Sequence, residues 1–182
     1  MRIISGSAKG RPILCPRGLR TRPTSDRVRE AIFSIIGDRV KGTGVVDLFA
    51  GTGAYGLEAL SRGALKTTFV DRSSTAARFI RKNAAVCRFE SLSSVVTAPV
   101  VPFIINGGIT DGTGLVFVDP PYGGSEGIKT LMALSENAKS LTGGLLVFEC
   151  SSFDEPDVIP SGLEITDRRR YGDTAVIFLM VS

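Results

Sequence analysis

A glycine-rich loop between a strand and a helix is the feature that most constrains the fold of this chain. Residues 51–56 read Gly-Thr-Gly-Ala-Tyr-Gly, follow an apolar segment over residues 45–49 and open a helix predicted over residues 55–62. Asp71 lies twenty positions after Gly51, where a second strand is expected to end. Glycines here let the backbone turn tightly and approach a ligand, and the acid can accept hydrogen bonds from ribose hydroxyls. The pattern predicts a site for NAD, FAD or S-adenosylmethionine; the alternative is a glycine turn that only packs the helix on the strand.

Asp47, near the end of the first strand, favours the last of these ligands. It lies four positions before Gly51, where a carboxylate would repel the pyrophosphate of a dinucleotide. S-adenosylmethionine has no phosphate and carries an amino group and a sulfonium, so an acid nearby is favourable. An NAD-dependent oxidoreductase would leave Asp47 without a role.

The second motif is Asp119-Pro120-Pro121-Tyr122, which follows a strand predicted over residues 115–118. In an open α/β sheet, ligands bind outside the carboxyl ends of the strands. Two consecutive prolines fix two φ angles and remove two N–H donors, which leaves the Asp119 carboxylate and the Pro120 carbonyl as acceptors. They suit the –NH₂ group of a base that has left its helix or loop and stacks on Tyr122. The alternative is a Pro-Pro turn that ends a strand, with Tyr122 in the core.

The order of the elements predicts an α/β fold with a mostly parallel seven-stranded sheet and helices on both faces. Strands are expected at residues 45–49, 67–70, 95–97, 115–118 and 145–148, with a closing hairpin of residues 163–171 and 174–181. Helices are expected from Thr24 or Ser25 to Gly37, and over residues 55–62, 74–86 (capped by Ser74) and 128–138. The first of these has an apolar stripe of Val28, Ala31, Ile32, Ile35 and Ile36.

The charge of the chain is distributed unevenly. Residues 1–41 contain ten Lys and Arg against three Asp and Glu, a net charge of +7, whereas residues 42–182 have a net charge of −3. A basic N-terminal segment on a mildly acidic body indicates a polyanion bound at one end; the alternative is a solvated, Arg-rich surface. The chain is expected to comprise a basic β-hairpin and connector over residues 1–23, with strands at residues 2–5 and 11–15, and a Rossmann-like domain over residues 24–182.

Composition excludes several classes of chemistry. The chain has no histidine, which excludes Ser-His triads and His-rich metal sites. Its three cysteines are far apart with no CxxC pair, so they indicate neither a zinc site nor a disulfide framework, and they fit a reducing cytoplasm. We expect a cytoplasmic protein with no metal and no membrane segment.

Six stretches of the chain match the pattern of one known family: residues 2–6, 9–11, 21–33, 47–53, 56–64 and 118–122. Together they resemble the RsmD-like methyltransferases, which methylate the 2-amino group of guanine 966 in bacterial 16S rRNA. The resemblance covers nearly the whole chain. Asp-Pro-Pro-Tyr also occurs in DNA adenine methyltransferases, so residues 21–33 are the discriminating stretch.

The resemblance implies an S-adenosylmethionine-dependent, Rossmann-like methyltransferase whose partner is 16S rRNA. It assigns the cofactor site to Asp47, Phe49, Gly51, Gly53, Gly56 and Asp71, and the target guanine to Asp119, Pro120, Pro121 and Tyr122. It places five basic residues near the RNA or the active-site mouth: Lys9, Arg11, Arg22, Arg27 and Arg29. For Arg27 and Arg29 the alternative is an ion-paired helix face with Asp26 or Glu30. A small basic hairpin suits backbone and shape better than base sequence, so the expected substrate is an assembled or assembling small ribosomal subunit, bound by a monomer.

Pro99 departs from the family pattern. Members commonly have an acid after the third strand that contacts the adenine amino group, and here Pro99 occupies that place. This predicts weaker cofactor binding, or another group that replaces the contact. Two alternatives stay open: a DNA adenine methyltransferase, for which 182 residues leave little room for a DNA-recognition domain, and a silent RNA-binding module with the same fold.

Overall fold

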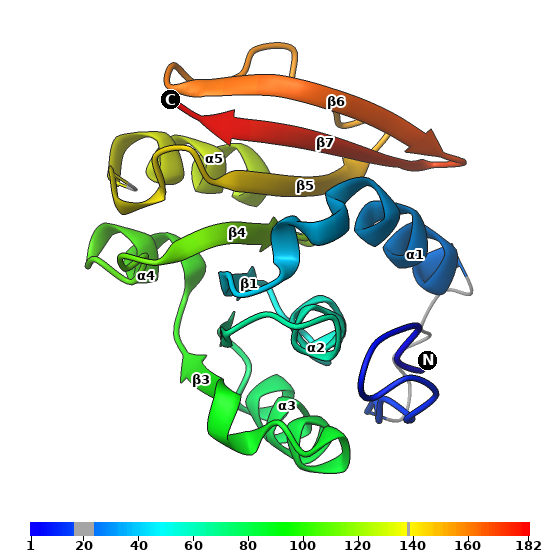
Figure 1. Ribbon diagram of the computed structural model, residues 1–182. Helices are drawn as coiled ribbons and strands as arrows, with labels where there is room; N and C mark the ends of the chain where they lie inside the picture. The colour runs from blue at the N-terminus through cyan, green and yellow to red at the C-terminus, as the bar shows by residue number, and fades with distance from the viewer. Residues whose placement is uncertain (17–23, 138) are drawn as a thin grey trace.

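A single mixed sheet is the centre of the molecule. The computed structural model describes residues 1–16, 24–137 and 139–182, and within them seven strands pair in the order β3-β2-β1-β4-β5-β7-β6 (Figure 1). The strands are β1 (Gly44–Leu48), β2 (Lys66–Asp71), β3 (Ser93–Thr97), β4 (Thr113–Val118), β5 (Leu145–Ser151), β6 (Leu163–Tyr171) and β7 (Thr174–Val181). The first five are parallel, and β7 runs antiparallel between β5 and β6. The predicted mostly parallel sheet with a closing hairpin is confirmed.

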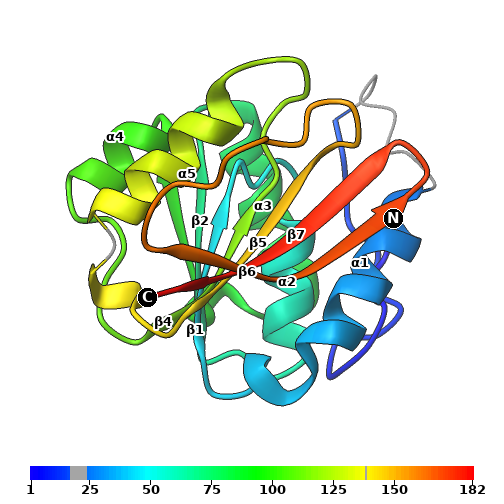
Figure 2. The ribbon, with the colours of Figure 1, turned by 90° about the horizontal axis from the view of Figure 1, so that it is seen from above.

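Helices cover both faces of this sheet, as predicted (Figures 1 and 2). One face carries α1 (Thr24–Ile36), α2 (Ala54–Ser61) and α3 (Ser74–Cys87), whose apolar residues share one core with inward residues of the strands. The other carries α4 (Val100–Ile105) and α5 (Glu126–Asn137) over a second core. The chain therefore crosses the sheet after β3, and this crossing leaves a crevice at the carboxyl ends of the central strands.

Several boundaries differ from the prediction for local reasons. Ser73, not Ser74, caps α3, because its Oγ accepts the Ala76 N–H at 3.3 Å. The helix α4 was not predicted; its N-cap is Pro99 and its first turn contains Pro102. Proline breaks a helix interior but costs little in a first turn, where the N–H groups have no helical partner. Ile35, placed on the apolar stripe, is 39% exposed.

The N-terminal segment forms less of a hairpin than expected. Its two arms run antiparallel, but they are joined by one isolated bridge between Arg2 and Pro12 rather than by two strands. The Ile4 and Ser5 N–H groups donate instead to the buried carboxylate of Glu58 on α2, at 2.7 and 3.0 Å. Anchoring on α2 thus adds to the backbone hydrogen bonds between the arms, in which Ile3 donates to Arg11, Gly10 to Ile3 and Ile13 to Met1.

A second anchor attaches the same segment to α3. The buried Asn83 side chain accepts the Leu14 N–H at 2.8 Å and donates to the Leu14 carbonyl at 2.9 Å. It also donates to the carbonyl of Thr52 in the glycine loop, at 2.9 Å. One side chain therefore holds the N-terminal segment against the loop.

Within the described parts of the chain, no helix has the length and apolar character to cross a bilayer.

Candidate active site

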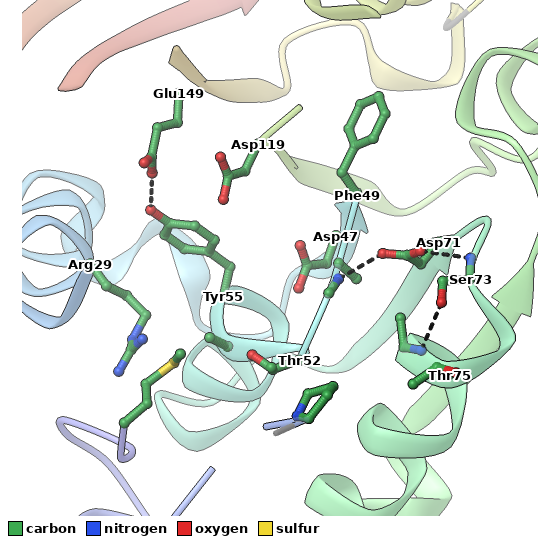
Figure 3. A pocket seen from close by; sticks show the side chains of 16 residues that line it. Arg29, Asp47, Phe49, Thr52, Tyr55, Asp71, Ser73, Thr75, Asp119 and Glu149 are labelled. Carbon is green, nitrogen blue, oxygen red and sulfur yellow. Dashed lines mark hydrogen bonds between the residues drawn. The ribbon is translucent and has the colours of Figure 1, made fainter. Parts of the chain in front are cut away.

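The candidate site is a cleft of about 450 Å³ at the carboxyl ends of β1, β2, β4 and β5. Figure 3 shows its side chains converging from these strands and from α2 and α3. It is lined by Met1, Pro16, Arg29, Asp47, Phe49, Ala50, Gly51, Thr52, Ala54, Tyr55, Asp71, Ser73, Thr75, Ala76, Asp119 and Glu149. The two predicted motifs and the acid after the second strand are therefore brought together.

Strand register explains this meeting. Leu48 pairs with Val70 on one side and with Val118 on the other, and Val118 pairs with Phe148. The next residue on each strand continues the row, which therefore reads Asp71, Phe49, Asp119 and Glu149. Because neighbouring strands are about 4.8 Å apart, three carboxylates and one aromatic ring follow one line across the edge of the sheet.

Asp47 lies beneath this row and is 2% exposed. Its carboxylate accepts the Gly56 N–H at 2.9 Å. Burial raises the pKa of this carboxyl from 3.8 to about 7; the Gly56 hydrogen bond opposes the rise and the nearby Asp71 charge strengthens it. A cation bound in the cleft would favour the ionised form.

The glycines of the loop have different roles. Gly51 has φ +55 and lines the cleft, where an added Cβ would meet only the Phe49 carbonyl at 3.9 Å. Gly56 is buried, and a Cβ there would lie 2.3 Å from the Phe69 ring. Gly53, also buried, is the N-cap of α2. The expected ligand contact is thus available at Gly51, whereas Gly53 and Gly56 pack α2 on the sheet and lie outside the cleft lining.

Asp71 is oriented by the backbone around it. Its two carboxylate oxygens accept the N–H groups of Gly51 at 2.9 Å and Ser73 at 2.8 Å, as Figure 3 shows. Two N–H donors fix a carboxylate and leave further lone pairs for a ligand. The predicted ribose acceptor is therefore held ready between the glycine loop and α3.

A second cavity of about 300 Å³ continues from the cleft and shares Phe49, Asp71 and Asp119 with it. Phe49 has φ +58, which is rare for an aromatic residue, and this turn ends β1 and presents the ring to both cavities. The remaining lining is Arg72, Pro99, Val100, Pro121 and Glu126. Pro99 thus lines the same cavity as Asp71, the expected ribose acceptor.

The Asp-Pro-Pro-Tyr loop follows β4 directly. Asp119 lines both cavities, Pro120 is buried, and Tyr122 is 40% exposed. The Tyr122 hydroxyl donates to Glu149 Oε1 at 3.1 Å. Tyr122 is thus not the core residue of the alternative interpretation; it lines a neighbouring cavity of about 410 Å³ together with Pro120 and Pro121.

Two residues of the site were missed by the sequence analysis, Tyr55 and Glu149. The Tyr55 hydroxyl donates to Glu149 Oε2 at 2.5 Å, and its ring stacks on Phe117 with centroids 4.9 Å apart. Burial, followed by the Glu149 and Asp119 charges, raises the Tyr55 pKa well above 10. Burial is also the main cause that raises the Tyr122 pKa, to about 12. Both phenols therefore stay protonated and act as donors to Glu149.

The five basic residues expected near RNA differ from one another in the structure. Lys9 and Arg27 are exposed. Arg11 donates to the Val86 carbonyl at the end of α3, so it has a structural role. Arg29 is 1% exposed and bonds the Arg2 carbonyl at 2.6 Å and Asp26 at 3.1 Å. Arg29 thus shows the ion-paired alternative, with Asp26, and it also lines the cleft. Arg22 lies outside the described residues.

Comparison with known proteins places the chain in a family. A family model described as "Conserved hypothetical protein 95" matches residues 1–180. The chain belongs to this family. Among its relatives is the Bacillus subtilis protein named "Putative rRNA methyltransferase YlbH", 35% identical, with 97% of this chain and 96% of the relative covered.

Further relatives in the Conserved hypothetical protein 95 family agree in activity and fold. The Escherichia coli "Ribosomal RNA small subunit methyltransferase D" is 30% identical over 96% of this chain and 87% of its own length. The solved structure of the Escherichia coli "Putative methyltransferase yhhF" superposes with a TM-score of 0.88 at 29% identity, covering 100% of this chain and 98% of that one. The chain is therefore a methyltransferase with the Rossmann-like fold of S-adenosylmethionine-dependent enzymes, and the predicted family and fold are confirmed.

Proposed function

We propose that this methyltransferase transfers the methyl group of S-adenosylmethionine to the 2-amino group of a guanine in small-subunit ribosomal RNA. The observation that carries the proposal is the position of Asp119. It stands in one row with Asp71, the expected ribose acceptor, and lines the cleft on the side away from it. An amino group held at Asp119 would lie beside the reactive end of a cofactor that begins at Asp71.

The cleft fits the charge of this cofactor. Its lining contains four carboxyl groups and one arginine, Arg29; the carboxyl groups belong to Asp47, Asp71, Asp119 and Glu149. A cleft this acidic disfavours a pyrophosphate and favours a ligand with an ammonium and a sulfonium. When bound, the cofactor supplies a methyl group on a positively charged sulfur, which is a reactive electrophile.

Each cofactor residue has a defined part in the proposal. Asp71 accepts hydrogen bonds from the ribose hydroxyls, Gly51 lets the chain approach the ligand, and Asp47 faces its positive charges. Phe49 and the cavity beside Pro99 enclose the adenine ring. Gly53 and Gly56 act indirectly, by holding α2 and the loop in place.

The Asp119 loop promotes methyl transfer by orienting the amino group of the target base. The Asp119 carboxylate and the Pro120 carbonyl accept the two hydrogens of the amino group, which directs the nitrogen lone pair toward the methyl donor. Pro121 keeps the turn rigid, and Tyr122 stacks on the base. The nitrogen forms the new N–C bond as the S–C bond breaks, and it then releases a proton to solvent. No strong general base is needed, because the proton leaves from a positively charged nitrogen.

Basic surfaces support an RNA substrate. Exposed Lys9 and Arg27 lie on the N-terminal segment and α1. The helix α3 adds exposed Arg78, Arg81 and Lys82, has no acidic residue, and is joined to the N-terminal segment through Asn83. Among the ion pairs of the described residues, none involves these three cations of α3. Cations without an acidic partner suit a phosphate backbone.

The wider context belongs to the same proposal. Residues 1–23 serve as an RNA-binding element on a catalytic domain of residues 24–182. The protein acts as a monomer on an assembled or assembling small subunit, in the cytoplasm and without a metal. The two curated relatives named above support the ribosomal RNA part of this proposal, because both are named as rRNA methyltransferases.

The test is methyl transfer from labelled S-adenosylmethionine to naked 16S rRNA, unmethylated small subunits and duplex DNA. We expect label on the RNA of the subunits, mapped to a guanine 2-amino group. Asp119→Ala should reduce transfer at least about 100-fold with cofactor affinity nearly unchanged, whereas the exposed control Glu164→Gln should keep full activity. Label on DNA adenine alone, or no transfer although the cofactor binds, would contradict the proposal.

A further inference from the structure

Glu149 stands next to the target position and has no part in the transfer described above. Because Val118 pairs with Phe148, Glu149 is the register neighbour of Asp119, about 4.8 Å away across the parallel strands. Figure 3 shows the two carboxylates side by side at the wall of the cleft. A base whose amino group is held at Asp119 therefore presents its adjacent ring atom toward Glu149.

The Glu149 carboxylate is held in one orientation. Tyr55 donates to Oε2 at 2.5 Å and Tyr122 to Oε1 at 3.1 Å. The two tyrosines donate to different oxygens, so both oxygens of the Glu149 carboxylate act as acceptors. The site therefore contains a fixed acceptor beside the one that holds the amino group.

Bases differ in what stands next to the reactive amino group. In guanine, the 2-amino group lies between the N1–H and the lone pair of N3, so a second donor stands on one side of it. In adenine the 6-amino group, and in cytosine the 4-amino group, is adjacent to a ring nitrogen with a lone pair. A fixed carboxylate at that point accepts from guanine and repels the other two bases.

We propose that Glu149 is the specificity-determining residue of this site, which accepts the N1–H of the target base and thereby selects guanine over adenine and cytosine. The inference rests on the proposed function and extends it, since it assigns base choice to a residue outside the Asp-Pro-Pro-Tyr loop. Tyr55 is then a positioning residue that holds Glu149. Tyr122 both stacks on the base and donates a hydrogen bond to Glu149.

The inference is tested by changing the base of the substrate. 2-Aminopurine keeps the reactive 2-amino group, lacks the 6-oxygen of guanine and has a lone pair in place of the N1–H. Small-subunit RNA is prepared by splinted ligation with guanine or 2-aminopurine at the methylated position, and kcat/KM is measured for both. For the unmodified enzyme, we expect guanine to be preferred by about 100-fold or more.

Glu149→Gln should reduce this preference to about 10-fold or less, because the glutamine amide can donate to the bare nitrogen. Tyr55→Phe should lower both values of kcat/KM and keep their ratio, since the carboxylate remains. Glu164→Gln, the same change on an exposed part of β6, should leave both values unchanged.

If Glu149 had only a structural role, Glu149→Gln would lower kcat/KM for guanine and 2-aminopurine alike. An unchanged ratio of the two values in Glu149→Gln therefore overturns the inference. Equal use of guanine and 2-aminopurine by the unmodified enzyme overturns it as well. Lack of transfer to guanine by the unmodified enzyme is a separate result, because it refutes the proposed function.

Discussion

Replacing Asp47 by asparagine tests whether its buried charge, which destabilises the folded protein, serves to bind a cationic ligand. The carboxyl is 2% exposed, and burial raises its pKa from 3.8 to about 7, against the effect of the Gly56 N–H and with that of the Asp71 charge. Asparagine has nearly the same shape, and its carbonyl oxygen can accept the same Gly56 N–H. The substitution therefore removes the charge with little change in packing.

The sign and size of the effect follow from proton linkage. The unfolded chain loses the Asp47 proton near pH 3.8, whereas the folded protein keeps it until about pH 7. The folded state thus binds more protons in this range, and stability falls as the pH rises from about 4 to about 7. The difference between 3.8 and about 7 corresponds to about 4 kcal/mol at pH 8. For 182 residues, Asp47→Asn should raise Tm at this pH by up to about 8–16 °C.

The assay is thermal unfolding of both proteins without cofactor at pH 4, 6 and 8. The two should unfold at similar temperatures at pH 4 and diverge up to pH 8. Cofactor binding at pH 8 should weaken by about 10–100-fold in the variant, because a hydrogen bond to a charged group is lost. Asp157→Asn, at an exposed acid, is the control and should change neither quantity. Equal stability of Asp47→Asn and the unmodified protein throughout would refute the reasoning.

Three further substitutions address other parts of the molecule. Pro99→Asp should tighten cofactor binding by about 10-fold in equilibrium dialysis, because it places a carboxylate beside the adenine cavity at a helix N-cap that accepts aspartate. Glu58→Gln should destabilise the protein by about 3–5 kcal/mol in urea unfolding, because the partners of this buried carboxylate include Arg29 and Arg62. The third change replaces three cations of α3, Arg78, Arg81 and Lys82, by glutamine. In a plot of the logarithm of the 16S rRNA binding constant against the logarithm of the salt concentration, the magnitude of the slope should fall by about 2–3, and cofactor affinity should stay unchanged.

Each of these has a defined opposite outcome. Pro99→Ala is the control for the proline, and an equal gain in affinity from both variants would exclude the carboxylate as the cause. For Glu58→Gln, unchanged hydrogen exchange of residues 1–16 would contradict the anchoring role. For α3, glutamine at Lys66, Lys129 and Lys139 removes the same charge elsewhere, and an equal fall in the salt slope would show that net charge alone is responsible.

The parts of the site that depend on neighbouring residues in the chain could be predicted from the sequence. The glycine loop, Asp71 and the Asp119 loop each follow a strand, and the carboxyl ends of parallel strands meet at one edge of a sheet. Their positions in the cleft confirm this. The helix α4 was not predicted, because it begins beside Pro99 and contains Pro102; prolines at a helix start forfeit no helical hydrogen bond.

Contacts between distant segments could not be predicted. Tyr55 and Glu149 are separated by 94 positions, and neither belongs to a motif that names the other. Arg29 has the same charge in the sequence whether it faces RNA or the interior. Its fate depends on Glu58 of α2, which is fully buried and lies 3.8 Å from the Arg29 guanidinium. One signal could have identified Glu149: its position beside Asp119 in the strand register. That signal can be used only when the order of the strands is known.

Two buried carboxylates on neighbouring elements, Asp47 and Glu58, show how a binding charge differs from a structural one. Glu58 has cations at 2.7 and 3.8 Å and accepts two backbone N–H groups, so its charge is neutralised by the protein. Asp47 accepts one N–H, and no ion pair of the described residues involves it. A buried charge is costly unless it is paired, and the raised pKa of Asp47 expresses that cost. Since Asp47 opens onto the cleft and Glu58 does not, we propose that a positive group of the ligand supplies the counter-charge of Asp47.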